Sequence, residues 1–293
     1  MAALPAIVAL LALGFQAPLL GAPDTLLVED RAFGSFQRAT RLAVSPQGWL
    51  YALDADRNLI LLLKEDGSVA SSVGGYGWTA TTLDEPSGLA TDGLSVYVSD
   101  FGNHRVLRFD RRLNYISSFT TRDTDYVAAR FGYPAGVALS RLGDLFILDT
   151  ENVRVVKYTG NGRFERSFGG IDEVRGRLAR PLKILAASND HIYVLEADRV
   201  LEYDYFGNHI RTIGNAVLKG ARGFDVIGDR AVVATQDALY WFSERGEVAF
   251  ETPFRSLLTS SPIDDVEDVA IVRDTLFVLT IGKIVAFKIR AFE

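Results

Sequence analysis

Short stretches of alternating apolar and polar residues recur along the chain from about residue 26. Segments 93–100 and 143–150 are rich in β-branched and aromatic residues and are bounded by Gly and Asp, which is typical of strands. RVLRF at 105–109, RVVKY at 154–158 and RVLEY at 199–203 alternate as half-buried strands do. Beyond the N-terminal leader, no window shows a helical stripe. The pattern predicts an all-β protein.

These strands belong to a repeat. The acid that closes the second predicted strand of each copy falls at Asp54, Asp100, Asp149 and Glu196, and Thr235 and Thr280 replace it in the last two copies. The spacings are 46, 49, 47, 39 and 45 residues, a period that belongs to propeller blades. Four strands per copy and six copies predict a six-bladed β-propeller over residues 24–293.

The two ends of the repeat region fit ring closure. The last copy stops after its third strand, whereas the N-terminal piece LLVEDRAFGSF resembles a fourth strand. An N-terminal strand that completes the last blade removes the exposed edge between the first and last blades. The sequence therefore predicts that Leu26–Phe33 pairs with Ile284–Ile289.

The first 23 residues carry no charged side chain, and AIVALLALGFQA at Ala6–Ala17 is an apolar run of about a dozen residues. This length suits a signal-peptide core better than a membrane span, which needs ~20 residues. We interpret residues 1–22 as a signal peptide or, alternatively, an uncleaved N-terminal anchor. Only in the second case do we expect membrane attachment. Export without any cysteine favours a bacterial periplasmic or extracellular protein.

The composition and the missing motifs exclude several classes of function. The net charge of −6 argues against a nucleic-acid partner, because phosphate binding needs a basic surface. The absence of cysteine excludes disulfides, thiolate catalysis and Cys-based metal sites. No Gly-x-Ser-x-Gly occurs, and the glycine-rich stretches lack a following helix, so they are turns and not phosphate cradles.

The stretch DFGNHRVLRFD at Asp100–Asp110 resembles the core of an NHL repeat. The second copy matches the family pattern nearly throughout, the third has Val153 in place of the His, and the fifth and sixth are degenerate. The resemblance implies a propeller fold and leaves function open, since NHL-like propellers include protein-binding and RNA-binding modules as well as metal-dependent enzymes. We expect the signature acids to accept turn N–H groups and the signature arginines to cover neighbouring blades.

An NHL-like lyase is known to hold zinc with three His, so the placement of the histidines matters. Strand polarity puts His104 at the top face, where each first strand begins, and puts His191 and His209 near the bottom of blade 4. Three such His cannot share one metal. Calcium held by channel carboxylates remains the metal option, and no cofactor is otherwise predicted.

First strands should line the central channel. Aligning the Pro-x-Gly glycine of the copies gives a ring whose members are Arg41, Gly88, Gly136, Lys183, Asp225 and Asp268. Four of them are charged, and Glu267 is beside the last. The ring is either a polar ligand pocket with Asn103 and His104 on its rim, or a self-neutralising plug, since unpaired buried charge is costly. Asp225 and Asp268 would be the ligands of any metal.

Aromatic residues in two inter-blade loops are the other functional signal. Tyr76 and Trp78 lie in the first of these loops, and Tyr126, Phe131 and Tyr133 lie in the second. They are either docking anchors or packing between blades. We expect a monomeric, non-enzymatic binding or scaffold module that takes a protein or a small polar ligand on its top face. The alternative is a metal-dependent hydrolase or lyase-like enzyme that uses the channel carboxylates.

Overall fold

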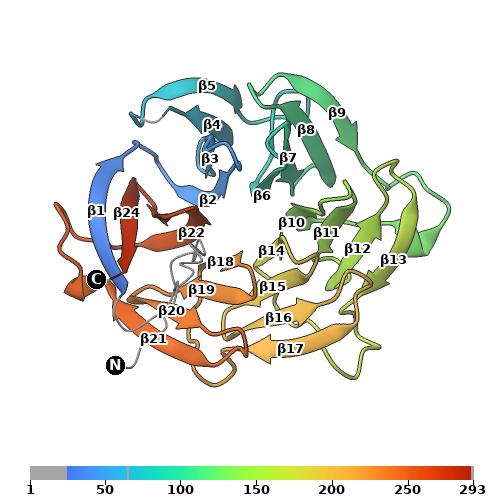
Figure 1. Ribbon diagram of the computed structural model, residues 1–293. Helices are drawn as coiled ribbons and strands as arrows, with labels where there is room; N and C mark the ends of the chain where they lie inside the picture. Colours follow the sequence, from blue (N-terminus) through green and yellow to red (C-terminus); the bar gives the residue numbers. More distant parts are fainter. Residues whose placement is uncertain (1–24, 65, 292–293) are drawn as a thin grey trace, which may run out of the picture.

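The computed structural model describes residues 25–64 and 66–291, and within them every regular strand belongs to one of six four-stranded antiparallel sheets. The sheets are arranged as blades around a central channel (Figure 1). The predicted all-β, six-bladed propeller is confirmed. The predicted leader, residues 1–22, lies outside the described residues.

The blades follow the sequence repeat. Blade 1 contains β2 (Ala39–Val44), β3 (Leu50–Asp54), β4 (Leu59–Leu63) and β5 (Val69–Gly74). Blade 2 contains β6 (Pro86–Thr91), β7 (Ser95–Asp100), β8 (Arg105–Asp110) and β9 (Tyr115–Phe119). Blade 3 contains β10 (Pro134–Leu139), β11 (Leu145–Asp149), β12 (Arg154–Tyr158) and β13 (Phe164–Phe168).

The remaining blades have the same order. Blade 4 contains β14 (Lys183–Ala186), β15 (Ile192–Glu196), β16 (Arg199–Tyr203) and β17 (His209–Ile213). Blade 5 contains β18 (Gly223–Ile227), β19 (Arg230–Ala234), β20 (Ala238–Phe242) and β21 (Val248–Pro253). Blade 6 contains β22 (Val266–Val272), β23 (Thr275–Thr280), β24 (Ile284–Ala291) and, as its outer strand, β1 (Thr25–Phe33).

The N-terminal strand closes the ring as predicted. β1 runs antiparallel to β24, with Leu27 opposite Ile289 and Phe33 opposite Ile284, and one bulge lies between Glu29 and Arg31. In Figure 1 the blue β1 lies beside the red β24, so the two ends of the repeat region share one sheet. This pairing covers the edge that blade 6 would otherwise expose.

The hydrophobic core lies between neighbouring blades. One cluster joins Tyr51 and Ile60 of blade 1 to Val96 and Leu107 of blade 2, and none of these side chains is accessible to solvent. Each such apolar side chain contributes ~1.5–3 kcal/mol on burial. Packing between sheets, rather than within one, therefore holds the ring together.

Helix is almost absent from the described residues: two 3-10 turns occur, η1 (Val127–Ala129) and η2 (Phe254–Ser256). No helix there is both long and apolar enough to cross a bilayer. The first strand of each blade lines the channel, and the fourth runs around the rim (Figure 1). We keep the name top face for the side where first strands begin, and bottom face for the side where they end.

Candidate functional site

The register of the first strands assigns the channel ring. In each blade, one residue of the first strand pairs with the second-strand residue that precedes the closing acid or Thr. This first-strand residue is Arg41 in blade 1, Lys183 in blade 4 and Asp268 in blade 6. In blades 2 and 3 it is glycine, as the sequence indicated. In blade 5 it is Gly223, opposite Ala234, and not Asp225. The alignment of Asp225 with the ring is wrong by two residues.

The glycines have a steric reason for being there. A Cβ on Gly88 would lie 2.7 Å from the Cα of Gly136 in the next blade, and a Cβ on Gly223 would lie 2.4 Å from the Cα of Asp268. Both distances are shorter than real Cβ contacts. The first strands therefore approach so closely at this level that glycine is required at these positions.

Lys183 and Asp268 form an ion pair across the channel, from blade 4 to blade 6. Lys183 Nζ lies 2.5 Å from Asp268 Oδ1 and also donates to the carbonyl of Phe224 in blade 5 at 2.9 Å. Asp268 is fully buried and Lys183 is 9% exposed. The second carboxylate oxygen of Asp268 accepts the N–H of Leu42 at 3.1 Å. One ion pair thus links blades 4, 5, 6 and 1.

Arg41 closes the same level of the channel from the opposite side. Its Nη2 donates to the carbonyl of Leu182 at 2.7 Å, and its Nη1 donates to the carbonyl of Thr40 at 2.8 Å. Leu182 directly precedes Lys183 in blade 4, so the Arg41 side chain spans the channel. Arg41 thus donates to two backbone carbonyls at this level of the channel.

Asp225 lies one layer deeper, opposite Val232. It lines a cavity of about 130 Å³ whose walls come from the first strands of all six blades and whose roof includes Lys183. Its oxygens accept the N–H of Val226 at 2.8 Å and that of Ile271 at 2.6 Å. Burial raises the pKa of Asp225 to about 6, although nearby Lys183 opposes that shift.

The oxygens of both channel carboxylates have hydrogen-bond or ion-pair partners within the protein. The oxygens of Asp268 accept hydrogen bonds from Lys183 and from backbone N–H groups. Both oxygens of Asp225 accept backbone N–H groups. Calcium needs six to eight oxygen ligands. Residues 25–64 and 66–291 contain no group of three or more His, Asp or Glu that could hold a metal ion. Glu267 is only half-buried, and burial raises its pKa against the pull of Arg222 and Arg41.

Asn103 and His104 lie in the turn between β7 and β8, on the top face. The backbone of His104 is left-handed, with φ at 52°, as it is at Asn58 and Val153, which hold the same position in blades 1 and 3. His104 Nδ1 accepts the N–H of Tyr133 at 3.2 Å, and the two rings lie 4.1 Å apart. Burial lowers the pKa of His104.

The NHL signature of blade 2 fixes the loop that enters that blade. Asp100 is fully buried and accepts the N–H of Asp84 at 2.7 Å and the Nε–H of Arg105 at 2.7 Å. Arg105 also donates to the carbonyls of Trp78 at 3.0 Å, Thr79 at 2.8 Å and Thr82 at 2.9 Å. The signature acid therefore accepts a backbone N–H of the preceding inter-blade loop, that of Asp84.

Asn103 adds a further restraint on this loop. Its amide donates to the carbonyl of Gly77 at 2.9 Å and to Asp100 at 2.9 Å. The loop so held presents Tyr76, 73% exposed, and Trp78, 76% exposed. Exposed aromatic rings on a hydrogen-bonded backbone are typical of docking anchors, because little conformational freedom is lost on binding.

Two further aromatic rings lie on the top face, one in the β7–β8 turn of blade 2 and one in the next inter-blade loop. Tyr133, from this inter-blade loop, is 42% exposed and lies against Phe101 at a tilt, with ring centres 5.1 Å apart. We call Tyr76, Trp78, Phe101 and Tyr133 the aromatic strip. The other two aromatic candidates differ from each other: Tyr126 is 60% exposed, whereas Phe131 is buried and packs in the core.

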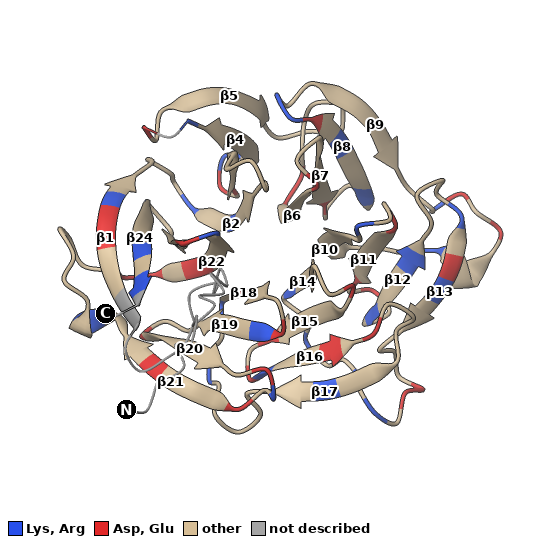
Figure 2. Ribbon diagram, in the orientation of Figure 1, with Lys and Arg blue, Asp and Glu red and all other residues tan. Residues whose placement is uncertain are grey.

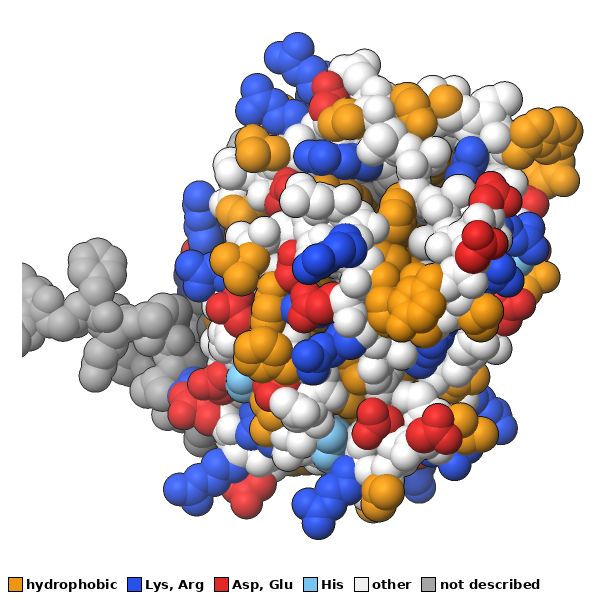
Figure 3. All heavy atoms as spheres, turned by 90° about the vertical axis from the view of Figure 1, so that its right-hand side faces the viewer, with side chains coloured by type: hydrophobic (Ala, Val, Ile, Leu, Met, Phe, Trp, Pro, Cys, Tyr) orange, Lys and Arg blue, Asp and Glu red, His pale blue; other side chains and the backbone are white. Residues whose placement is uncertain are grey.

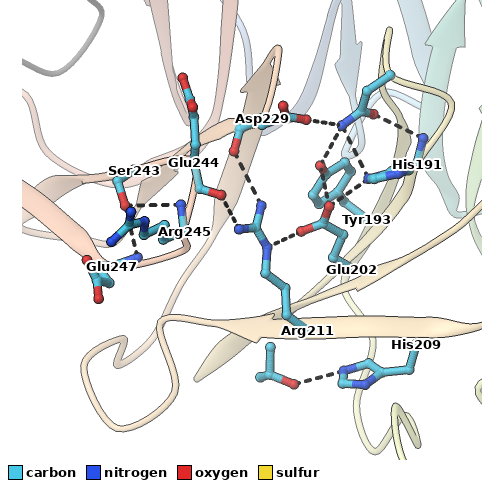
Figure 4. A network of polar contacts seen from close by, with 12 residues as sticks. His191, Tyr193, Glu202, His209, Arg211, Asp229, Ser243, Glu244, Arg245 and Glu247 are labelled. Atoms are coloured by element: carbon cyan, nitrogen blue, oxygen red, sulfur yellow. Dashed lines mark hydrogen bonds and ion pairs between the residues drawn. The ribbon is translucent and has the colours of Figure 1, made fainter.

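The two remaining histidines have structural partners of their own. His191 Nδ1 lies 2.7 Å from Glu202 Oε1, and the buried Glu202 also accepts the hydroxyl of Tyr193 at 3.0 Å and the guanidinium of Arg211. Arg211 in turn reaches carbonyls of blade 5, so this network joins two blades (Figure 4). His209 contacts Thr212 at 3.1 Å, outside that network.

Charges of both signs are spread over the blades. Lys and Arg are interspersed with Asp and Glu over the blades (Figure 2). On the side viewed in Figure 3, basic, acidic and hydrophobic side chains are interspersed, without a broad basic field. A polyanion such as RNA would have little on this side to bind.

Comparisons with known proteins agree with the fold. The sequence model of the NHL repeat matches residues 83–109 and 131–158, in blades 2 and 3. Protein brain tumor of Drosophila melanogaster is 26% identical over 111 residues, which are 36% of this chain and 11% of that protein. The present chain therefore spans a small fraction of that curated relative.

Two solved propellers are similar in structure. A streptogramin B lyase has a TM-score of 0.63 at 12% identity, covering 92% of this chain and 99% of that one. A catalytically inactive His-to-Ala variant of virginiamycin B lyase from Staphylococcus aureus, with quinupristin, has a TM-score of 0.60 at 14% identity, covering 85% and 80%. At such identities the likeness concerns the fold alone.

Proposed function

We propose that this six-bladed propeller with NHL repeats is a non-enzymatic binding module that captures a protein partner on its top face. The observation that carries the proposal is the aromatic strip. Its outer members Tyr76 and Trp78 are about three-quarters exposed, yet the backbone beneath them is held by Arg105 and Asn103. Large aromatic anchors on a rigid frame are what protein interfaces use.

The contacts of the charged residues in the channel support the same proposal. The charged groups at its upper level already satisfy one another, through the Lys183–Asp268 pair and the hydrogen bonds of Arg41. A side chain that is paired and hydrogen-bonded within the protein would have to break these contacts to bind a ligand, which costs free energy. These side chains therefore act as a plug that stiffens the ring.

The enzymatic alternative has weaker support in the site. It needs a metal or a free acid–base group at the channel carboxylates, and the oxygens of Asp225 and Asp268 are engaged by backbone N–H groups and Lys183. The similarity to streptogramin B lyases is a similarity of fold, and fold alone does not assign an activity.

We further propose that the protein acts outside the cytoplasm, in the periplasm or beyond. The support is the uncharged, apolar stretch of residues 1–22 together with the absence of cysteine. Cleavage of residues 1–22 is tested by N-terminal sequencing of the protein recovered from envelope fractions. An intact chain in the cytosol would contradict export.

The binding proposal is tested with the Tyr76→Ala/Trp78→Ala double variant. Immobilised wild-type protein should retain a defined set of proteins from an extract of its source cells, and the double variant should lose it. Trp49→Ala is the matched control, since Trp49 lies on the bottom face and is 38% exposed. Equal retention by all three proteins, with the propellers folded, would reject the top-face strip as the binding surface.

A further inference from the structure

The channel has a second ring of residues beneath the charged one. Two positions further along each first strand, the side chain lies on the same face of the strand as the ring residue before it. In blade order these residues are Ala43, Ala90, Ala138, Leu185, Asp225 and Ala270. We call them the lower ring. All six line the cavity of about 130 Å³, and one of them is charged.

The alanines of the lower ring account for the space. Four of its six members carry a single methyl group, so the side chains do not fill the channel at this level. Apart from Lys183, Asp225 and Thr91, every described residue that lines the cavity is aliphatic. An apolar cavity of ~150 Å³ accommodates a molecule the size of benzene. A compact ligand of about six non-hydrogen atoms would therefore fit.

The cavity is closed above and extends downward. Above it lie the Lys183–Asp268 ion pair and the close approach of two first strands, where a Cβ on Gly223 would lie 2.4 Å from the Cα of Asp268. Below, its lining reaches the last residues of four first strands, Val44, Thr91, Leu139 and Ala186. First strands end at the bottom face, so a ligand would enter from there.

The Asp225 carboxylate keeps hydrogen-bonding capacity for such a ligand. One of its oxygens accepts the N–H of Val226 at 2.8 Å, and the other accepts that of Ile271 at 2.6 Å. An ionised carboxylate offers about four lone-pair sites, so about two remain. An ammonium group can donate to them while both backbone hydrogen bonds stay in place, since it carries three N–H groups.

The charges around the cavity favour a cationic ligand over an anionic one. Lys183 and Asp268 are the charged groups that act on Asp225, and they form an ion pair with each other. Ionised Asp225 therefore leaves one negative charge uncompensated at the upper end of the cavity. Burial raises the pKa of Asp225 to about 6, because the charged form has lost its water. A cation beside the carboxylate would stabilise that form.

We propose that the lower channel binds a small primary alkylammonium ion, with its ammonium group on the Asp225 carboxylate and its alkyl chain against the alanines of the lower ring. The carboxylate was desolvated when the protein folded, so on binding mainly the ammonium group loses water. Contact between the alkyl chain and the aliphatic walls removes apolar surface from water. This site is separate from the aromatic strip and does not depend on the function proposed for the top face.

Calorimetric titration of the whole chain with pentylammonium chloride at pH 7.5 tests the proposal. We expect saturable binding at one site, more than about tenfold weaker for Asp225→Asn because the ligand then lacks its counter-ion. Asp237→Asn is the matched control: it makes the same change of charge in the same blade, at an exposed position outside the cavity, and should bind like the wild type. Ala90→Leu keeps every charge but fills part of the cavity, so it should weaken binding as well.

The charge and pH dependence of binding provide a second readout. 1-Pentanol and pentanoate, close to pentylammonium in size but neutral and anionic, should bind more weakly. Binding of pentylammonium should weaken about tenfold between pH 7 and pH 5, because protons compete for Asp225 while the amine stays charged.

Several results would overturn the proposal. Absence of pentylammonium binding to the wild type is one, and unchanged binding by Asp225→Asn is another. Pentanol that binds as tightly as pentylammonium would make the cavity an apolar pocket without a role for the carboxylate. Tighter binding of pentanoate would assign the cavity to anions that pair with Lys183. Circular dichroism and thermal unfolding of each variant separate loss of binding from loss of fold.

Discussion

The guanidinium of Arg105 donates to the backbone carbonyl of Trp78, 27 residues earlier in the chain, across 3.0 Å. The same side chain pairs with the buried Asp100. A signature residue of one blade thus holds the loop that arrives from the previous blade, and with it the most exposed tryptophan of the protein. The repeat signature is structural, and it positions the proposed binding surface.

Replacing Arg105 with Ala should destabilise the protein by about 3 kcal/mol, because Asp100 would remain buried without its cation and three carbonyls would lose a donor. Arg57→Ala is the matched control from blade 1. Arg57 approaches Asp54 only to 3.6 Å and is 41% exposed, so its loss should cost less than about 1 kcal/mol. Chemical denaturation of both variants checks this, and equal costs would contradict the assigned role.

Replacing Lys183 with Met should lower the free energy of unfolding by about 3–5 kcal/mol, since it leaves the buried carboxylate of Asp268 without a cation. Adding Asp268→Asn should restore part of that stability, because the remaining amide is neutral and its oxygen still accepts backbone N–H groups. The unfolding free energies of the two single variants and the double variant measure the coupling. Additive losses would show that the two side chains do not interact.

Asp225 should make stability fall as pH rises. Burial raises the pKa of Asp225 from 3.8 to about 6, so the folded protein binds more protons than the unfolded chain between those values. The stabilising proton is present below about pH 4 and is lost as pH passes 6, a change on the order of 3 kcal/mol. Relative to the wild type, Asp225→Asn should therefore gain stability between pH 4 and pH 7. A constant difference across that range would contradict the raised pKa.

Gly223→Ala tests the register of blade 5. The new Cβ would lie 2.4 Å from the Cα and Oδ1 of Asp268, so we expect a loss of about 3 kcal/mol from overpacking. Gly282→Ala is the control, because a Cβ there meets nothing within 4 Å, and its effect should stay within about 0.5 kcal/mol. Thermal unfolding of the two variants decides; a tolerated Gly223→Ala would restore Asp225 to the ring.

Tryptophan fluorescence should report the exposure of the aromatic strip. Trp78 is 76% exposed, Trp49 38% and Trp241 2%. Trp78→Phe should therefore remove most of the emission that acrylamide quenches, with a stability change within about 0.5 kcal/mol. Trp241→Phe should leave the quenching almost unchanged. Strong quenching that survives Trp78→Phe would mean that this loop is folded against the protein.

The sequence alone was enough to predict the propeller, because its evidence is local. The period of the closing acids, the alternation within strands and the turn residues each depend on neighbours along the chain. Ring closure was equally predictable, since an incomplete last copy and an unpaired first strand leave one solution. The match of Leu27 with Ile289 and of Phe33 with Ile284 confirms it.

The site depended on contacts between blades, which no local pattern records. Asp225 resembled a ring residue because blade 5 is degenerate in sequence, and only the pairing of Gly223 with Ala234 moved it one layer deeper. The partners of Asp100 and Arg105 lie 16 to 27 residues away in another loop, so their side chains could be assigned to a turn but not to the loop they hold. Only the packing of neighbouring sheets decided that Phe131 is buried and that Trp78 is exposed. Periodicity therefore determined the fold, whereas the tertiary structure determined which polar groups satisfy one another and which rings remain exposed to meet a partner.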